Sequence, residues 1–454
     1  MLDRTGLSAI CATTAAMAVA VVLAAMPLTL ASCTWAPAGY TASGGAPTDA
    51  PTPVLTGRPT CNPATLEHDL RFLASDDMEG RALGSKGLQQ ALQTVAERFR
   101  DLGLLPPFPQ KASPQDPLAG YFQKFEIQGH PPMANVIGIL PGHPEVSPRA
   151  VVVGAHADHI GRDPKLKGDQ IYNGADDNAS GMASLLAIAS MMSATEEGQR
   201  DRAVIFVVFS GEESGLLGSR HYVDHPVVPH EDVMAMINLD CVGHLRNDQI
   251  IVFGTGTARE FSRMLIGLNQ AFGFDIVERP EGAGASDHTS FFAKGIPALH
   301  FFTGPHKYYN KVTDEADRIN FEGLARLTDY VGELVRYLRY RGRPLTFEAV
   351  GTEQMAMMEK MAKIGQRKVS LGFMPDFSMA SGGVKVGPVR EGGVASQAGI
   401  EKGDVITAID GESIDTLIDY SAVLRSHSAG DRITVTVLRA NESLNLKVTV
   451  QEAK

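Results

Sequence analysis

Three apolar runs, each followed by charged or imidazole side chains, constrain the fold of this chain most strongly. The runs are 150–155, 203–209 and 234–239. Apolar runs of this length, bounded by polar loops, are typical of the buried strands of a largely parallel sheet. The side chains that follow them are, in chain order, His156, Asp158, Glu212, Glu213 and Asp240. Three strand ends therefore deliver one imidazole and several carboxylates.

These polar strand ends are expected to meet, because ligands in an open α/β sheet bind outside the carboxyl ends of its strands. Asp177 joins them from the glycine-rich segment 173–181, which leads into an apolar helix at 182–192. Buried charge without a partner is costly, and a divalent cation removes that cost. One imidazole with several carboxylates suits zinc, and two adjacent ions can share a bridging carboxylate. The sequence thus predicts a hydrolytic zinc centre.

The chemistry of such a centre assigns different roles to the two adjacent glutamates. A metal activates water and polarises a carbonyl, while a carboxylate within hydrogen-bond reach takes the proton of the water. Glu212 can be this general base only if it stays off the metal, and Glu213, which points the other way from the adjacent backbone position, is then the ligand. Peptide hydrolysis is the expected reaction.

From about Thr65 to Arg341 the chain resembles the co-catalytic zinc exopeptidases related to bacterial leucyl aminopeptidase, aminopeptidase Y and glutamate carboxypeptidase. Beyond the residues above, three segments carry the resemblance: Ser286-Asp287-His288, Gly295-Ile296-Pro297 and Phe301-Phe302-Thr303-Gly304. The resemblance implies an α/β fold with a central mixed, largely parallel sheet flanked by helices. It also implies two zinc ions and, most simply, an aminopeptidase.

The resemblance further implies a role for each site residue. His156 and Asp240 would hold one zinc, Glu213 would hold the other, and Asp177 would bridge them. The remaining roles would be Glu212 as general base, Asp158 orienting the imidazole, and Tyr309 donating to the oxyanion. A loop tyrosine packed on the rim is the alternative for Tyr309.

One residue departs from the pattern of this family. Asn310 stands where the last zinc ligand should be a histidine, although Asp314 follows four residues later as expected. An amide oxygen is a weaker zinc ligand than an imidazole nitrogen. Three outcomes follow: weak occupancy of the second zinc position, which we favour, its replacement by His306 after a loop shift, or a single-metal site. The other nearby histidines are interpreted as packing, capping or surface residues: His159, His221, His225, His244 and His288.

The N-terminus indicates where the chain acts. The charge-free run Leu7–Leu30 ends at Leu30-Ala31-Ser32-Cys33, which resembles the lipobox of a bacterial lipoprotein precursor. We expect a signal peptide at 1–32, a lipid on Cys33 and a flexible Pro/Ala/Gly/Thr-rich tether at 33–60. The chain would then be membrane-anchored in the bacterial cell envelope, facing the periplasm or the exterior. An uncleaved anchor and an ordinary signal peptide are the alternatives.

Composition excludes one class of partner and leaves one cysteine question open. A net charge of −11 on 454 residues provides no basic field for nucleic acid. Cys61 and Cys241 could pair in an oxidising compartment, although Cys241 beside Asp240 is more simply a small buried residue.

The chain divides after the zinc peptidase domain, which is expected at 61–343. A helical connector is expected at 344–368, and 369–454 resembles a PDZ domain at Gly383–Val386, Gly392–Ile400 and Gly403–Gly411. Such domains take a peptide C-terminus by strand addition, with the carboxylate at a loop of backbone N–H groups. Leu371, Gly372 and Phe373 form the matching loop. A PDZ fold that only packs and binds nothing is the alternative.

Three functions remain open from the sequence. The leading one is a membrane-tethered zinc exopeptidase acting on peptides. The second is a catalytically silent homologue that binds peptides through its PDZ domain. The third is an acyltransfer enzyme like glutaminyl cyclase, which is disfavoured because that family uses the last histidine, absent here, as a ligand.

Overall fold

The computed structural model describes residues 60–143, 149–194, 202–351, 369–376, 382–390, 392–415, 417–440 and 442–452. The expected signal peptide, Cys33, nearly all of the tether and most of the connector lie outside these residues. Among the described helices, none combines the length and the apolar character needed to cross a membrane.

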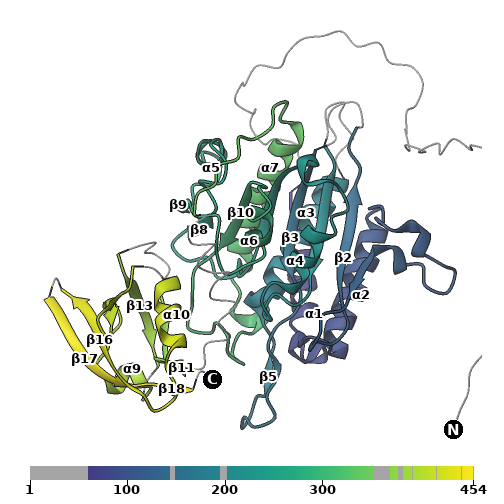
Figure 1. The fold of residues 1–454 in the computed structure, drawn as a ribbon. Helices are drawn as coiled ribbons and strands as arrows, with labels where there is room; N and C mark the ends of the chain where they lie inside the picture. Colours follow the sequence, from purple (N-terminus) through teal and green to yellow (C-terminus); the bar gives the residue numbers. More distant parts are fainter. Residues whose placement is uncertain are drawn as a thin grey trace, which may run out of the picture. The chain divides into compact units, whose positions relative to one another are not determined.

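The N-terminal domain is built on an eight-stranded mixed sheet in the order β1-β2-β6-β3-β7-β10-β8-β9 (Figure 1). The four central strands, β6, β3, β7 and β10, are parallel to one another, and the three apolar runs predict β3, β6 and β7. The expected fold class is therefore confirmed. The strand bounds are β1 Phe122–Phe125, β2 Met133–Leu140, β3 Ala150–His156, β6 Val204–Phe209, β7 Val233–Leu239, β8 Gln249–Phe253, β9 Asp275–Arg279 and β10 Ala298–Phe302.

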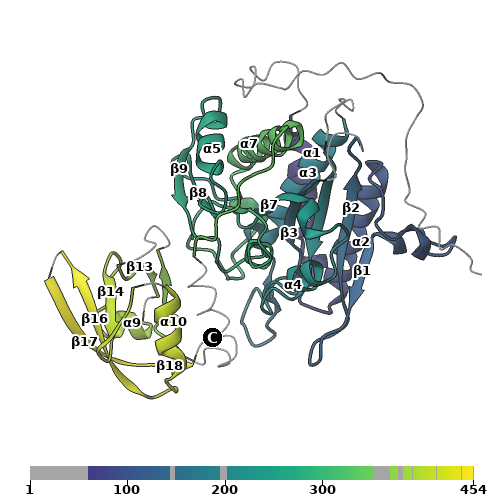
Figure 2. The same ribbon diagram turned by 45° about the horizontal axis from the view of Figure 1, so that its top comes forward.

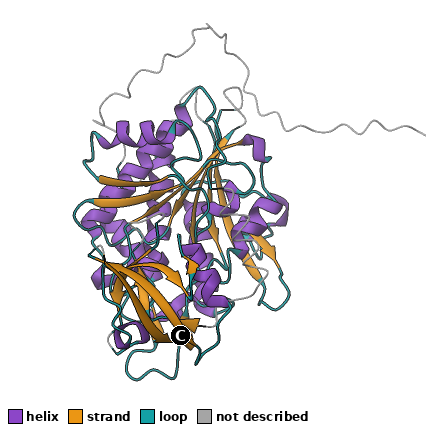
Figure 3. Ribbon diagram, turned by 60° about the vertical axis from the view of Figure 1, so that its left-hand side comes forward, coloured by secondary structure: helices purple, strands orange, loops and turns teal. Residues whose placement is uncertain are grey.

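Helices cover both faces of this sheet (Figure 3), and strand β6 shows why its sequence is apolar throughout. Val204, Phe206 and Val208 belong to the core under one group of helices, of which α1, α3 and α7 contact one another (Figure 2). Ile205, Val207 and Phe209 belong to a second core with residues of α4 and α6. The helix bounds are α1 Pro63–Leu73, α2 Lys86–Asp101, α3 Gly181–Ser193, α4 Leu217–Asp224, α5 Phe261–Asn269, α6 His288–Phe292 and α7 Phe321–Tyr340.

The register of the central strands brings the polar strand ends together. Strand β3 lies between β6 and β7, and His156, its last residue, is opposite Phe209, the last residue of β6. Asp240 directly follows the end of β7. The helical turn η4 (Ala175–Ser180), which carries Asp177, leads into α3.

The C-terminal domain has its own apolar core and an antiparallel sheet in the order β12-β13-β14-β16-β17, with β15 paired to β14. The first and last strands, β11 and β18, pair separately. The bounds are β11 Val369–Ser370, β12 Phe373–Pro375, β13 Val384–Val389, α9 Val394–Gln397, β14 Val405–Ile409, β15 Glu412–Ser413, α10 Leu417–Arg425, β16 Arg432–Arg439, β17 Glu442–Thr449 and β18 Gln451–Glu452.

Candidate metal centre

His156, Asp177 and Asp240 form the first group of side chains able to hold a metal ion. The Nε2 atom of His156 lies 3.4 Å from Oδ1 of Asp177 and 3.3 Å from Oδ1 of Asp240. The side chains of His156 and Asp177 are only 1% and 5% exposed. The structure therefore brings together the three residues that the sequence assigns to one zinc ion.

The second group shares Asp177 with the first and contains an imidazole that the sequence analysis assigned to packing. Nδ1 of His159 lies 2.9 Å from Oε1 of Glu213 and 3.7 Å from Oδ2 of Asp177. The His159 side chain is fully buried. One oxygen of Asp177 thus faces His156 and the other faces His159, which is the arrangement of a carboxylate that bridges two cations.

The pKa values of these side chains are shifted in the directions expected for metal ligands. Burial raises the pKa of Glu213 to about 7, and nearby carboxylates add to that rise. Burial, followed by the charge of Glu213, also raises the pKa of Asp177. Burial lowers the pKa of His159 to about 4, so its imidazole is neutral, the form that binds metal. The raised pKa values show that ionising these carboxylates in the protein is costly. A divalent cation bound between them and the neutral imidazoles would offset that cost.

Asp158 occupies the expected place but makes different contacts from those expected. Its carboxylate accepts the backbone N–H groups of Gly211, Glu212 and Glu213 at 2.7, 3.1 and 3.3 Å. The His156 ring instead contacts the backbone carbonyl of Asp158, 3.1 Å from Nδ1. Asp158 therefore fixes the turn that carries both glutamates, and it orients the imidazole through its main chain.

Two buried side chains hold the backbone around Asp177. Asp314 accepts the N–H groups of Asp176 and Asp177 at 3.0 to 3.1 Å. The fully buried Arg81 donates to the carbonyls of Ala157, Leu73, Asn173 and Gly174 at 2.5 to 2.9 Å. Burial lowers the pKa of Arg81 to about 10, against the pull of Asp177 and Asp314. Arg81 thus links the loop after β3, which carries His159, to the loop of Asp177.

Asp240 is positioned by Ser286, whose hydroxyl donates to its Oδ2 at 2.8 Å. The same hydroxyl accepts a hydrogen bond from the amide of Asn238 at 2.8 Å. Burial raises the pKa of Asp240, but the charge of His156 and its hydrogen bond to the ring outweigh burial and hold that pKa well below its usual range. Ser286 therefore orients the carboxylate of Asp240, a candidate ligand.

The loop after β10 carries three candidate site residues, Tyr309, Asn310 and His306, and only Tyr309 lies close to the two groups around Asp177. Tyr309 is close enough to the cluster that, after burial, the charge of Asp177 contributes to raising its pKa well above the usual value. Asn310 is exposed, with a left-handed φ of 53°. His306 turns to Asp176, with Nε2 2.9 Å from Oδ2, and belongs to neither of the first two groups. His306 is thus not placed as the substitute ligand that the sequence suggested.

Comparison with known proteins agrees with this geometry. Residues 135–335 match the model of peptidase family M28, and residues 370–450 match that of the PDZ domain. The chain thus contains a segment similar to peptidase family M28, followed by a segment similar to PDZ domains. Zinc is the metal that this family implies, and the first two groups above could hold it.

Two curated proteins are similar to part of this chain. A probable leucine aminopeptidase of Arthroderma otae is 30% identical over 260 residues, which cover 54% of this chain and 64% of the relative. Aminopeptidase YwaD of Bacillus subtilis is 29% identical over 209 residues, covering 43% of each chain. The chain therefore spans between about two fifths and two thirds of these relatives.

A solved structure shares the fold. The glutaminyl cyclase of Porphyromonas gingivalis has a TM-score of 0.50 and 19% identity, covering 61% of this chain and 98% of that one. At this identity the likeness concerns the fold alone.

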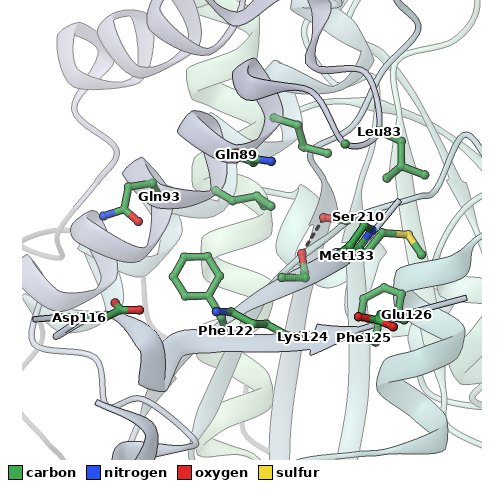
Figure 4. A pocket seen from close by; sticks show the side chains of 15 residues that line it. Leu83, Gln89, Gln93, Asp116, Phe122, Lys124, Phe125, Glu126, Met133 and Ser210 are labelled. Carbon is green, nitrogen blue, oxygen red and sulfur yellow. Dashed lines mark hydrogen bonds between the residues drawn. The ribbon is translucent and has the colours of Figure 1, made fainter. Parts of the chain in front are cut away.

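A separate pocket of about 690 Å³ lies between α2 and strands β1 and β2 of the N-terminal domain (Figure 4). Phe122, Phe125 and Met133 are among its apolar lining residues, and Lys124 and Glu126 are among its charged ones. None of the metal-centre residues lines this pocket. The metal centre is therefore separate from this pocket.

The two cysteines among the described residues do not pair. Cys61 and Cys241 are both buried and free, so they form no disulfide.

The loop of the PDZ-like domain is held by backbone hydrogen bonds. The carbonyls of Leu371 and Gly372 accept the N–H groups of Ala395 and Arg390 at 2.8 and 3.1 Å. Gly372 has φ 77°, and Phe373 begins β12. The loop is thus fixed by its backbone at the start of the strand to which a peptide would add.

Proposed function

We propose that this protein is a zinc-dependent exopeptidase, and specifically an aminopeptidase, that hydrolyses peptides outside the cytoplasm. The observation that carries this proposal is the sharing of the buried Asp177 by two groups of potential ligands, each with a buried imidazole. The curated relatives are named as aminopeptidases, which supports recognition of the amino end of the substrate.

Two zinc ions fit the donors of the centre. His156, Asp177 and Asp240 would hold one ion, and His159, Asp177 and Glu213 would hold the other. When bound, the ions would supply Lewis-acid activation of water and of the scissile carbonyl. His159 takes the place that Asn310 leaves without an imidazole, so we propose that both positions have a full set of protein ligands.

Glu212 is the proposed general base. It is held off the second group by the turn that Asp158 fixes, while the neighbouring Glu213 faces His159. Burial raises the pKa of Glu212 well above its usual value, although the charge of His156 opposes this rise. A carboxylate with a raised pKa is a stronger base than usual, and once protonated it can return the proton to the leaving amine.

Tyr309 is the proposed donor to the oxyanion. Burial and then the charge of Asp177 raise the pKa of its phenol well above the usual value, so the hydroxyl keeps its proton. A protonated phenol near the carboxylates can donate a hydrogen bond where negative charge develops on the carbonyl oxygen of the substrate.

The remaining parts of the proposal concern location and a second peptide site. We propose that Cys33 carries the lipid that anchors the protein to a bacterial membrane, on the strength of the lipobox-like sequence alone. We also propose that Leu371, Gly372 and Phe373 receive the C-terminus of a peptide, because this loop leads into β12 as strand addition requires.

The test is hydrolysis of a panel of amino-acid arylamides by the purified chain, before and after removal of metal and after return of zinc. Cleavage that follows zinc content supports the proposal. A zinc-loaded protein that cleaves no arylamide but binds C-terminal peptides would support the catalytically silent homologue. Cyclisation of N-terminal glutaminyl peptides without arylamide cleavage would instead support a cyclase.

A further inference from the structure

Asp176, His244 and His306 form a third buried group beside the metal centre. Their side chains offer one ligand atom each within 4.8 Å of one another. The three residues are 0%, 7% and 3% exposed. His244 and His306 are stacked, with ring centroids 3.8 Å apart, and neither belongs to the two groups around Asp177.

Three polar atoms of this group make no well-aligned hydrogen bond. They are Oδ2 of Asp176 and Nε2 of each histidine, judged among the described residues. The other carboxylate oxygen of Asp176 is occupied, because it accepts the N–H of Gly243 at 2.6 Å and the hydroxyl of Ser180 at 3.2 Å. The carboxylate is therefore fixed with its free oxygen turned toward His306, 2.9 Å from Nε2.

Leaving these atoms unpaired would be expensive. A buried polar group without a partner costs on the order of 1–3 kcal/mol, and a charged one costs more. Two imidazoles with one carboxylate are a common donor set for zinc and other divalent transition-metal ions, with the remaining positions open to solvent or a further ligand. We propose that Asp176, His244 and His306 bind a third divalent transition-metal ion of the zinc class, separate from the two catalytic positions.

The place of the three residues in the chain gives this ion a structural role. Asp176 precedes the shared ligand Asp177, His244 follows β7, and His306 lies three residues before Tyr309. One ion would therefore join the loop of the bridging carboxylate to the loop that carries the oxyanion donor. The loop after β10, which has Asn310 where the family resemblance implies a histidine, would then be tied to metal through His306.

A competing state of the same residues is a shared proton. The N–H of Tyr308 lies 3.3 Å from Nδ1 of His306, which favours a proton on Nε2 facing Asp176. In that state Asp176 and His306 form a hydrogen-bonded pair with His244 stacked on it, and no ion is held. Binding of an ion requires the proton to move to Nδ1 and the long contact with Tyr308 to open.

Metal counting distinguishes the two states. Full-length protein is stripped of metal, dialysed against micromolar Zn²⁺, and its zinc is counted by mass spectrometry. His244→Phe keeps a stacked ring but removes the nitrogen ligands. His221→Phe is the matched control, because His221 is also stacked on a histidine, His225, at 4.3 Å but faces no such group.

We expect three equivalents of zinc in the wild-type protein and in His221→Phe, and two in His244→Phe. Equal zinc content in His244→Phe and wild type overturns the proposal. If His244→Phe fails to fold, His306→Gln replaces it, and a wild-type protein that holds no more than two ions overturns the proposal without any variant. A difference of one ion in a protein that cleaves no arylamide would support the third site while rejecting the proposed activity.

Discussion

Replacing His159 tests the residue whose interpretation changes most from the sequence to the structure: the sequence analysis assigns it to packing, and the structure places it in a potential ligand group. His159→Phe keeps a ring in a fully buried position but removes Nδ1, which lies 2.9 Å from Glu213. The second metal position would then retain only two carboxylates, one of them shared with the first ion. We expect the second zinc to become weakly bound and the first to remain tight.

The magnitude follows from the number of ligands lost. Changing a residue that only supports a metal ligand already costs 10–100-fold in affinity. Removing one of three protein ligands should cost at least the upper end of that range, about 100-fold. At about 1.4 kcal/mol for each tenfold change, this is about 2.8 kcal/mol of binding free energy. Turnover at limiting zinc should fall with the occupancy of the second position.

Calorimetric titration of the metal-free protein with Zn²⁺ measures this change directly. Asn310→His is the informative companion, because Asn310 is exposed in the structure and its replacement should leave the affinity of the second ion nearly unchanged. If His159→Phe bound the second zinc as tightly as wild type, His159 would not be a ligand. Marked tightening by Asn310→His would instead show that the second position is weak for want of the missing imidazole.

Further expectations concern the base, the supporting residues, pH and the anchor. Glu212→Gln should lower turnover about 100-fold or more with zinc content unchanged, since it removes a proton acceptor and no ligand; near-normal turnover would reverse the roles of Glu212 and Glu213. Asp314→Asn should lower the free energy of unfolding by about 1–3 kcal/mol, because an amide keeps only one of the two oxygens that accept the backbone N–H groups of Asp176 and Asp177. An unchanged midpoint of thermal unfolding would contradict this expectation. The pKa of Glu213 is raised to about 7, so below that pH zinc must displace a proton from Glu213. The affinity of the second ion should therefore fall as the pH drops below about 7 and stay constant above it, and zinc titrations that do not depend on pH would contradict the assignment. Cys33→Ala should release the protein from membranes, and unchanged fractionation and lipid labelling would exclude the anchor.

The sequence predicts those parts of the centre that depend on strand ends. Parallel strands end at one edge of the sheet, so His156 and Asp240 had to meet once 150–155 and 234–239 were recognised as neighbouring strands. The same reasoning places the turn of Glu212 and Glu213 beside them. Asp177 is outside this logic, but its polar, glycine-rich segment before an apolar helix marked it as functional.

The sequence does not predict groups whose role depends on the path of a loop. His159 follows Asp158 directly, and the spacing His-x-Asp-His was a visible signal. Its direction, however, is set by Arg81, whose carbonyl accepts the N–H of His159 and whose guanidinium holds the neighbouring loops. Arg81 follows three acidic residues, Asp76, Asp77 and Glu79, and such a charged segment is typical of the surface. In the structure the guanidinium is instead buried and donates to backbone carbonyls.

If His159 is the second imidazole ligand, as we propose, the loops after β3 and β10 have separate tasks. His156 ends β3 and His159 lies three residues later, so one short segment would supply an imidazole to each metal position. The loop after β10 would then bring Tyr309 to the substrate without supplying a ligand to either ion, and its contacts through Asp314 and His306 hold it beside Asp177 and Asp176. On this proposal a shift of Tyr309 would not require a ligand of the second ion to move.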